Sequence, residues 1–441
     1  MYFWLLVLAE IATIIAASQT PLLAPHQAEG LDHYAFKWPI KKVAIIGAGP
    51  SGLINYREFT HAGFDVRVFE RDTLPGGNWH YSEEAPNNTP IPNAHISVGD
   101  YIPSLPPKGV ELPCEEVYEG PDITEFPWPK GTSWELPHAK IARYIRAFAS
   151  YHGVNSNDEN PRISYNTRVE RVEKHFSPLG EEAGWTLTLK TLTRTGPHSV
   201  KATWRTENFD AVVIASGRYN APNIPNIKGL KEWANVFPKR IIHSRQYRRP
   251  QSFANQTVLI VGAATSGGEI ARDLNPHVKK IYQSIRPDNV TKPHFRLDFF
   301  LRRIPANISI VPEIKQFHAP GKSIHSSGIE LANGTVHNTS ITSEDDGEED
   351  QNEPRPIVTD GTHLRSLYLD IFYIEEPTLV NVGMQSFTYA EYIGVALSKV
   401  WAGTAHLPTT REMWRRQRER VAELGGYGPH FQFLGSERTD R

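Results

Sequence analysis

Residues 43–52 read Val-Ala-Ile-Ile-Gly-Ala-Gly-Pro-Ser-Gly, an apolar run that leads directly into the spacing G-x-G-x-x-G. In a strand–turn–helix unit the first glycine permits a tight turn and the second lets a pyrophosphate approach the backbone. The third lets the helix pack closely on the strand. Gly47, Gly49 and Gly52 hold these three positions. The sequence therefore predicts a dinucleotide-binding unit at this place.

The next residues complete the first unit. A helix is expected over residues 50–62, opened by Pro50 and Ser51, with its first N–H groups facing anionic phosphates. A strand is expected over residues 65–69, and Glu70 closes it where an acidic side chain binds a ribose hydroxyl. An ordinary glycine-rich loop with a surface glutamate is the alternative. The order of strand, turn, helix, strand and acid favours the nucleotide site.

A second unit of the same design lies at residues 258–267, Val-Leu-Ile-Val-Gly-Ala-Ala-Thr-Ser-Gly. Gly262 and Gly267 keep the outer glycine positions, and Ser266 precedes the last of them. Ala264 replaces the middle glycine, so its methyl group is expected to crowd a phosphate slightly. Two such turns in one chain predict two nucleotide cofactors.

The two units differ in the residues that close their second strand. The strand expected over residues 280–283 ends without an acid, and Ser284 and Arg286 come next. An arginine at this point can hold a 2′-phosphate, whereas a solvated surface cation is the alternative. The first site is therefore predicted to bind FAD and the second NADPH, which gives an α/β fold with two Rossmann-like dinucleotide-binding domains.

Further segments resemble the flavin-containing monooxygenase family, particularly its fungal members. Residues 237–247, Phe-Pro-Lys-Arg-Ile-Ile-His-Ser-Arg-Gln-Tyr, match the family motif F-x-G-x-x-x-H-x-x-x-(F/Y/W), with Lys239 in place of the glycine. Residues 76–79 are similar to its GGxW, and residues 215–222 to its A-T-G-x-Y segment. The resemblance spans residues 40–405 and implies three more cofactor-binding residues: Gly77, Trp79 and Gly217.

The resemblance also implies a domain order in which the NADPH domain is inserted into the FAD domain. The expected parts are the first part of the FAD-binding domain at 40–215, the NADPH-binding domain at 216–367, and the FAD-domain return with C-terminal helices at 368–441. Alternating residues at 185–190 predict a strand of a small antiparallel sheet.

The chemistry implied by the resemblance is reduction of FAD by NADPH, and then insertion of one oxygen atom from O2 at a nitrogen or sulfur centre of a small molecule. A role in secondary-metabolite biosynthesis is expected. His243 and Tyr247 are the candidate catalytic residues of the motif, and His243 is expected to position nicotinamide or relay a proton. A structural histidine that links the two domains is the alternative. Tyr247, in place of tryptophan, argues against the Baeyer–Villiger branch.

One segment departs from the family pattern Y-x-x-L-x-T-N. Residues 118–124 run directly into residues 125–129 without a matching asparagine, which lies near the flavin in the family. A flavoprotein NADPH oxidase, or a degenerate non-catalytic FAD-binding protein, is therefore an open alternative. A flavin amine or alcohol oxidase is a further one, although it should lack the second nucleotide domain.

Composition narrows the class of protein. The 441 residues are long enough for two domains, and a net charge of −2 with a pI near 6.8 gives no basic field for nucleic acid. Cys114 is the only cysteine, which excludes a C-x-x-C redox pair and a cysteine metal cluster. The chain is thereby separated from flavin disulfide reductases, and no metal site is expected.

Residues 1–18 form a hydrophobic segment that is interpreted as a signal peptide or anchor. The apolar run is shorter than the roughly twenty residues of a membrane span, and no Lys or Arg precedes it. The secretory pathway (endoplasmic reticulum or secreted) is therefore expected in preference to the cytoplasm, with membrane association through the N-terminus as an option. Six N-x-S/T sequons agree with secretory entry: Asn87, Asn255, Asn289, Asn307, Asn333 and Asn338.

Overall fold

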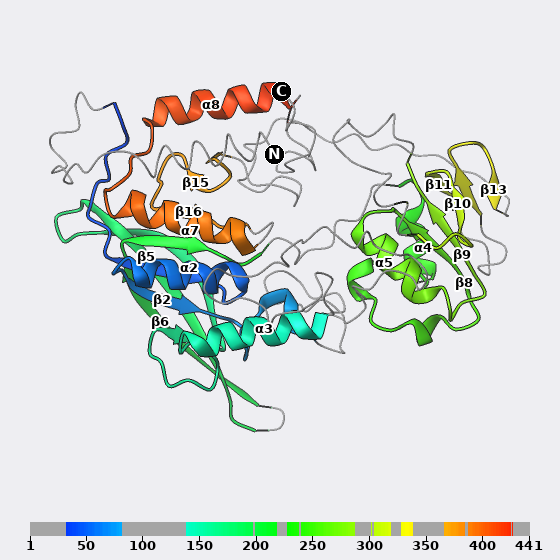
Figure 1. The fold of residues 1–441 in the computed structure, drawn as a ribbon, viewed down its shortest axis with the longest axis horizontal. Coiled ribbons are helices and arrows are strands. Elements are labelled where there is room, and N and C mark those ends of the chain that lie inside the picture. The colour runs from blue at the N-terminus through cyan, green and yellow to red at the C-terminus, as the bar shows by residue number, and fades with distance from the viewer. Residues whose placement is uncertain are drawn as a thin grey trace, which may run out of the picture.

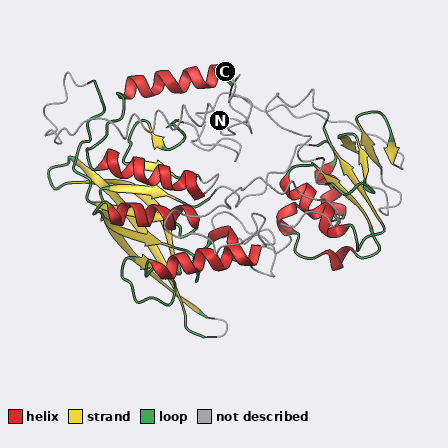
Figure 2. Cartoon of the chain, viewed as in Figure 1, coloured by secondary structure: helices red, strands yellow, loops and turns green. Residues whose placement is uncertain are grey.

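The computed structural model describes most of the two regions that carry the nucleotide turns. The described residues are 32–81, 138–196, 199–217, 227–237, 240–286, 301, 304–318, 328–337, 366–383, 387–424 and 426. Figures 1 and 2 show these residues as two lobes, side by side along the longest axis. The N-terminal segment lies outside the described residues, and so do residues 118–129, where the sequence departs from the family pattern.

The first lobe is built on a seven-stranded sheet in the order β14-β15-β16-β7-β1-β2-β3. The pairs β7/β1, β1/β2, β2/β3 and β16/β7 are parallel, and β14, β15 and β16 form an antiparallel meander. Its strands are β1 (Lys42–Ile46), β2 (Asp65–Phe69), β3 (Ile163–Ser164), β7 (Ala211–Ile214), β14 (Leu367–Tyr368), β15 (Phe372–Tyr373) and β16 (Leu379–Asn381). Because β16 pairs with β7, the chain returns to this sheet after the second lobe. The predicted insertion is confirmed.

The central strand β1 explains how this sheet is covered on both faces. Side chains alternate across a strand, so Val43 and Ile45 point to one face and Ala44 to the other. Val43 and Ile45 pack with the helices α2 (Pro50–His61), α3 (His138–Tyr151) and α7 (Phe387–Trp401). Ala44 packs instead with the second sheet of the lobe. The parallel sheet is therefore buried between a helical layer and an antiparallel sheet, as this kind of sheet requires.

The antiparallel sheet contains β4 (Thr167–Phe176), β5 (Glu182–Arg194) and β6 (Val200–Phe209), paired in that order. In β5, Trp185, Leu187 and Leu189 are buried against the parallel sheet and alternate with more exposed residues. This alternation is the one that the sequence showed at residues 185–190.

The second lobe contains a parallel sheet in the order β10-β9-β8 and an antiparallel sheet in the order β11-β12-β13. Its strands are β8 (Thr257–Val261), β9 (Lys280–Ser284), β10 (Ser309–Val311), β11 (Ile314–Phe317), β12 (Ile329–Leu331) and β13 (Val336–His337). Its helical segments are α4 (Leu230–Val236), the 3-10 turns η3 (Ser244–Gln246) and η4 (Pro250–Phe253), and α5 (Thr265–Leu274). The strand β8 leads into α5 as β1 leads into α2, so both lobes are Rossmann-like.

The remaining described elements are the 3-10 turn η2 (Gly77–Trp79) and the terminal helix α8 (Thr410–Glu423). None of the helices in the described part of the chain is long and apolar enough to cross a bilayer. The same residues contain no group of three or more His, Cys, Asp or Glu side chains placed to hold a metal ion.

Candidate functional site

The first turn is shaped by two glycines that no other residue could replace without a shift of the backbone. Gly47 has a φ of +109°, and a Cβ built on it would lie 2.7 Å from the carbonyl oxygen of Ala215. A Cβ on Gly52 would lie 1.9 Å from the carbonyl oxygen of Gly47. The turn, the first turn of α2 and the residue after β7 therefore approach each other closely at these two glycines.

Gly49 is different, because no contact with the described residues requires a glycine there. Its φ of −69° and ψ of 177° suit any residue, and an added Cβ would meet, in the described part of the chain, only the Cα of Gly77, at 3.8 Å. A Cβ on Gly77 would in turn lie 3.3 Å from the Cα of Gly49. The two bare backbones face each other beside the first N–H groups of α2, and the residue at the N-cap, Gly49 itself, has no side chain to cap that helix. This cradle fits a pyrophosphate, which needs close backbone approach and a helix N-terminus.

Glu70 follows β2 beside the same turn and is almost fully buried. One carboxylate oxygen accepts from the Ala48 N–H at 2.6 Å, and the other accepts from the Asp72 N–H at 2.8 Å. Burial raises the pKa of this carboxyl, and the two backbone donors oppose the rise. Each oxygen keeps a second acceptor position, so the carboxylate can still accept from a ribose hydroxyl.

The other predicted residues of the first site gather around this turn. Pro50 and Ser51 are the first residues of α2, and both are buried. Trp79 ends η2 and packs against the ring of His138, with centroids 5.3 Å apart. Gly217 lies two residues beyond Ala215, whose carbonyl covers Gly47. The structure therefore brings together the first set of residues singled out in the sequence.

The second turn repeats the first with one substitution. Gly262 has a φ of +99°, and a Cβ on Gly267 would lie 2.3 Å from the Gly262 carbonyl oxygen. Ala264 is the N-cap of α5 with φ −68° and ψ −176°, which is the conformation of Gly49 in the first turn. Its methyl group therefore causes no backbone strain. Ser266 is the second residue of α5 and half-buried.

The two residues predicted to bind the 2′-phosphate, Ser284 and Arg286, have different surroundings in the structure. Ser284 is 3% exposed, and its hydroxyl donates to the carbonyl oxygen of Pro312 at 2.9 Å. Arg286 is exposed, and its Nε lies 3.1 Å from a carboxylate oxygen of Glu313. Arg286 can reach a phosphate at the end of β9, whereas the Ser284 hydroxyl already serves the contact between β9 and the loop after β10.

His243 and Tyr247 lie beside α5 and have different surroundings. His243 is half-buried and caps η3, with Nδ1 accepting from the Arg245 N–H at 3.2 Å. Tyr247 is 2% exposed and donates its hydroxyl to Asp273 of α5 at 2.6 Å. Burial, together with this hydrogen bond, raises the pKa of the Tyr247 hydroxyl. The hydrogen bond from Tyr247 to Asp273 therefore stabilises the position of α5, the helix that begins at the second turn.

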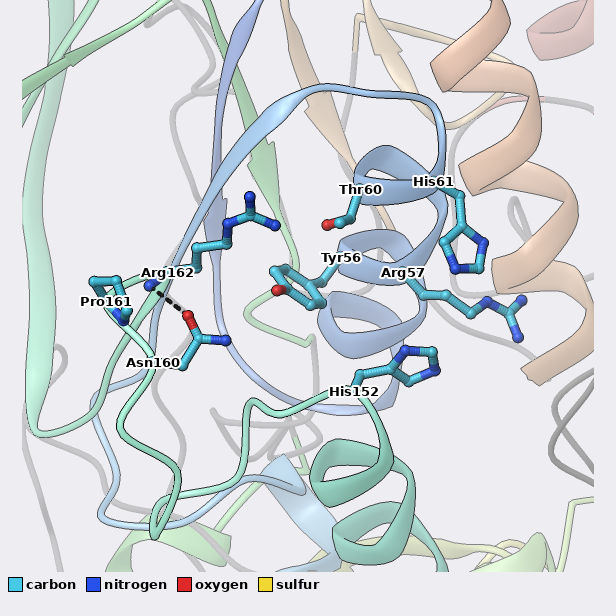
Figure 3. Close-up of a pocket in the computed structure, with 8 residues that line it drawn as sticks. All are labelled: Tyr56, Arg57, Thr60, His61, His152, Asn160, Pro161 and Arg162. Carbon is cyan, nitrogen blue, oxygen red and sulfur yellow. Dashed lines mark hydrogen bonds between the residues drawn. The ribbon is translucent and has the colours of Figure 1, made fainter.

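A separate cavity of about 410 Å³ lies away from both turns (Figure 3). It is bordered by the C-terminal half of α2, the residue after α3 and the segment before β3. The dinucleotide turn is at the opposite end of α2, so this cavity is not the cofactor site. Its lining residues are Tyr56, Arg57, Thr60, His61, His152, Asn160, Pro161 and Arg162.

Comparison with known proteins agrees with this arrangement. The sequence profile of the family described as Flavin-binding monooxygenase-like matches residues 40–290. The chain is 50% identical to flavin-containing monooxygenase iboF of Amanita muscaria, over 95% of this chain and 90% of that protein. The chain belongs to the flavin-binding monooxygenase-like family.

Two further proteins are similar to this chain over most of its length. Flavin-containing monooxygenase ustF2 of Aspergillus flavus is 28% identical over 90% of each chain. The fold is similar to that of S-allyl-L-cysteine S-oxygenase from Allium sativum, with a TM-score of 0.65 and 22% identity, over 91% of this chain and 86% of the other. The predicted α/β class with two nucleotide-binding domains is thus confirmed.

Family membership makes this chain a flavin-dependent oxidoreductase with FAD and NADPH as cofactors and O2 and a small molecule as substrates.

Sequence reasoning missed two supporting residues of the second site. Gln283 is fully buried and donates to the Gly262 carbonyl oxygen at 2.9 Å, and Asp273 receives the Tyr247 hydroxyl. Neither has a local signal, because each partner is distant in sequence. Lys239, the motif's departure from glycine, lies outside the described residues.

Proposed function

We propose that this monooxygenase inserts one oxygen atom at a nitrogen or sulfur centre of a small molecule, with NADPH as reductant. The observation that carries the proposal is the pair of unlike nucleotide turns on two separate sheets. A buried acid, Glu70, comes after the first, and an exposed cation, Arg286, comes after the second. An acid selects a free ribose hydroxyl, and an arginine selects a 2′-phosphate.

The residues of the first lobe hold the flavin. The Gly49–Gly77 cradle and the N-terminus of α2 take the pyrophosphate, and Glu70 takes the ribose of the adenosine half. Bound FAD, once reduced, supplies the activated oxygen. The protein's part is to orient this group and to keep water away from it.

The residues of the second lobe hold the nicotinamide cofactor. Gly262, Ser266 and Gly267 shape the turn for its pyrophosphate, and Arg286 takes the 2′-phosphate. His243 is proposed to position the nicotinamide or relay a proton, and Tyr247 to act through α5.

A soft nucleophile is the proposed substrate class, because activated flavin oxygen is transferred to nitrogen or sulfur lone pairs without a metal. The similar fold of the Allium sativum protein, named as an S-oxygenase of S-allyl-L-cysteine, supports a sulfur or amino-acid-like substrate. We further propose that the product belongs to secondary metabolism, in line with the expectation from the sequence.

Secretory routing through residues 1–18 is also a proposal. Three sequon asparagines lie in the described residues, namely Asn255, Asn307 and Asn333, and all three are exposed. Exposure is what a glycan requires, so these positions are compatible with entry into the secretory pathway.

The test is NADPH oxidation by purified protein with and without thioether, thiol and amine substrates. Oxygenation predicts that consumption of NADPH is matched by formation of an oxidised product. An NADPH oxidase would consume NADPH and return only hydrogen peroxide, and a non-catalytic flavoprotein would oxidise NADPH no faster than free flavin.

A further inference from the structure

The cavity beside the C-terminal half of α2 is lined by a buried tyrosine whose hydroxyl has no partner. Tyr56 is 4% exposed, and Figure 3 shows its ring directed from α2 towards the segment that precedes β3. The Tyr56 hydroxyl forms no hydrogen bond within the part of the chain that the structure describes. A buried hydroxyl without a partner is costly, because it has lost its water without gaining an acceptor.

A cation lines the same cavity from the segment before β3. In Figure 3 the guanidinium of Arg162 is turned towards α2, on the side where Tyr56 lies. The Arg162 side chain has neither an ion pair nor a hydrogen bond among the described residues. The planar fork of an arginine matches the oxygens of a carboxylate or a phosphate. Arg162 therefore offers both the charge and the geometry that an oxyanion needs.

The backbone that carries Arg162 is well fixed. The side-chain oxygen of Asn160 accepts from the Arg162 N–H at 2.9 Å, and the Asn160 amide donates to the Gly153 carbonyl oxygen at 2.7 Å. Pro161 restricts the backbone between them, and Ile163 begins β3, which pairs with β2. A ligand that binds here has to order only the side chain of Arg162.

The charges of the lining residues favour a ligand with a single negative charge. None of the described residues that line the cavity is acidic. The second arginine, Arg57, is already paired with Glu58 and with Glu391 of α7, and Figure 3 shows its guanidinium directed away from Arg162. Arg162 is thus the arginine of the lining whose charge is not compensated. A monoanion such as a carboxylate complements it better than a phosphate dianion does.

The end of α2 offers little opposition to an anion. A helix C-terminus is partly negative, because its last carbonyl groups have no helical partner. Here the carbonyl oxygen of Phe59 accepts from the Phe64 N–H at 3.0 Å. The carbonyl oxygen of Thr60 accepts from the N–H of Gly63 at 3.1 Å, and Gly63 has the left-handed φ of +87° that commonly closes a helix. These hydrogen bonds reduce the repulsion that an anion meets.

We propose that this cavity binds a small organic monocarboxylate, with Arg162 and the Tyr56 hydroxyl as donors to its two oxygens. The volume of about 410 Å³ lies within the range of ligand sites, about 300–1,000 Å³, so the ligand has a body beyond its carboxylate. Pro161 and the imidazole rings of His61 and His152 line the space for that body. The site is separate from both nucleotide turns and does not rest on the proposed oxygenation.

The experiment measures binding of benzoate to the FAD-loaded full chain by saturation-transfer NMR. Benzamide is the neutral analogue and should bind about tenfold more weakly, and inorganic phosphate is the second oxyanion. Arg162→Gln should weaken benzoate by about ten- to a hundredfold, the size of one charge-assisted hydrogen bond, and Arg162→Lys should recover part of the loss. Arg143→Gln, which removes an exposed arginine of α3 outside the cavity, should leave the Kd unchanged.

Tyr56→Phe separates ligand binding from a structural role. Because the hydroxyl has no partner among the described residues, its removal should leave thermal unfolding unchanged and weaken benzoate by about tenfold. A loss of stability with unchanged affinity for benzoate would make the hydroxyl structural and remove it from the site.

The site is overturned if benzoate and benzamide bind equally, or if Arg162→Gln leaves the Kd of benzoate unchanged. Tighter binding of phosphate than of benzoate would overturn the carboxylate as its ligand. Saturating NADP⁺ should not displace benzoate, and displacement would place benzoate at the nucleotide site instead. A chain that binds benzoate through Arg162 and yields no oxygenated product would contradict the proposed function and leave this site standing.

Discussion

Replacement of Arg286 by alanine should remove most of the preference for NADPH over NADH. The side chain is 60% exposed at the end of β9 and pairs with Glu313 at 3.1 Å. NADH has no 2′-phosphate, so its use should be almost unchanged. The variant thus separates recognition of the phosphate from the rest of nucleotide binding.

The expected size depends on the two partners of this arginine. A hydrogen bond between charged groups is worth about 1.5–3 kcal/mol. An exposed ion pair such as that with Glu313 is worth about 0–1 kcal/mol, and it must be given up when the phosphate binds. The net loss is therefore about 0.5–3 kcal/mol, or about a 2- to 140-fold fall in the NADPH/NADH ratio.

The assay is stopped-flow reduction of the flavin under nitrogen, with each nicotinamide cofactor varied in concentration. Glu313→Gln should act in the opposite direction and tighten NADPH by up to about fivefold, because the arginine is no longer shared. Lys280→Ala, an exposed cation at the other end of β9, is the matched control. An unchanged ratio in Arg286→Ala, or an equal loss with both cofactors, would refute the assignment.

Three further changes test other parts of the structure. Gly49→Val should give folded but colourless protein, because the backbone at this position suits valine while the valine side chain fills the cradle. Gly52→Val, in contrast, should not fold. Full flavin absorbance in Gly49→Val would reject the site. Tyr247→Phe leaves Asp273 without its donor, so thermal unfolding should show a loss of about 1–3 kcal/mol, with little change in the rate of oxygen transfer. A large fall in that rate with unchanged stability would instead give Tyr247 a direct catalytic part. In a eukaryotic host, the protein should fractionate with endomembranes or medium and lose mass on glycosidase treatment; an unglycosylated cytosolic product with an intact Met1 would end the routing proposal.

The two turns could be predicted from sequence because their outer glycines follow a fixed spacing after an apolar strand. A Cβ on Gly52 would meet the carbonyl group of Gly47, five residues earlier, so the spacing encodes that contact, whereas a Cβ on Gly47 would meet Ala215, far along the chain. The return of β16 to β7 came from the resemblance, since no local pattern selects a partner so far along the chain.

The site residues that sequence reasoning placed less well are those with distant partners. Ser284 has the right position in the sequence for a phosphate ligand, but its hydroxyl donates to Pro312. Tyr247 fits the family motif, yet its hydroxyl is directed at Asp273. Such contacts depend on how loops after β10 and residues of α5 pack, which periodicity does not report.

The most direct test of a flavin monooxygenase in this chain is the fate of oxygen-18 gas. Enzyme reduced by NADPH without air is mixed with ¹⁸O2 and a thioether or amine, and the product is analysed by mass spectrometry. One labelled oxygen atom in an S-oxide, N-oxide or hydroxylamine is the predicted result. Labelled hydrogen peroxide with every substrate recovered unchanged would contradict the oxygenase and favour an NADPH oxidase.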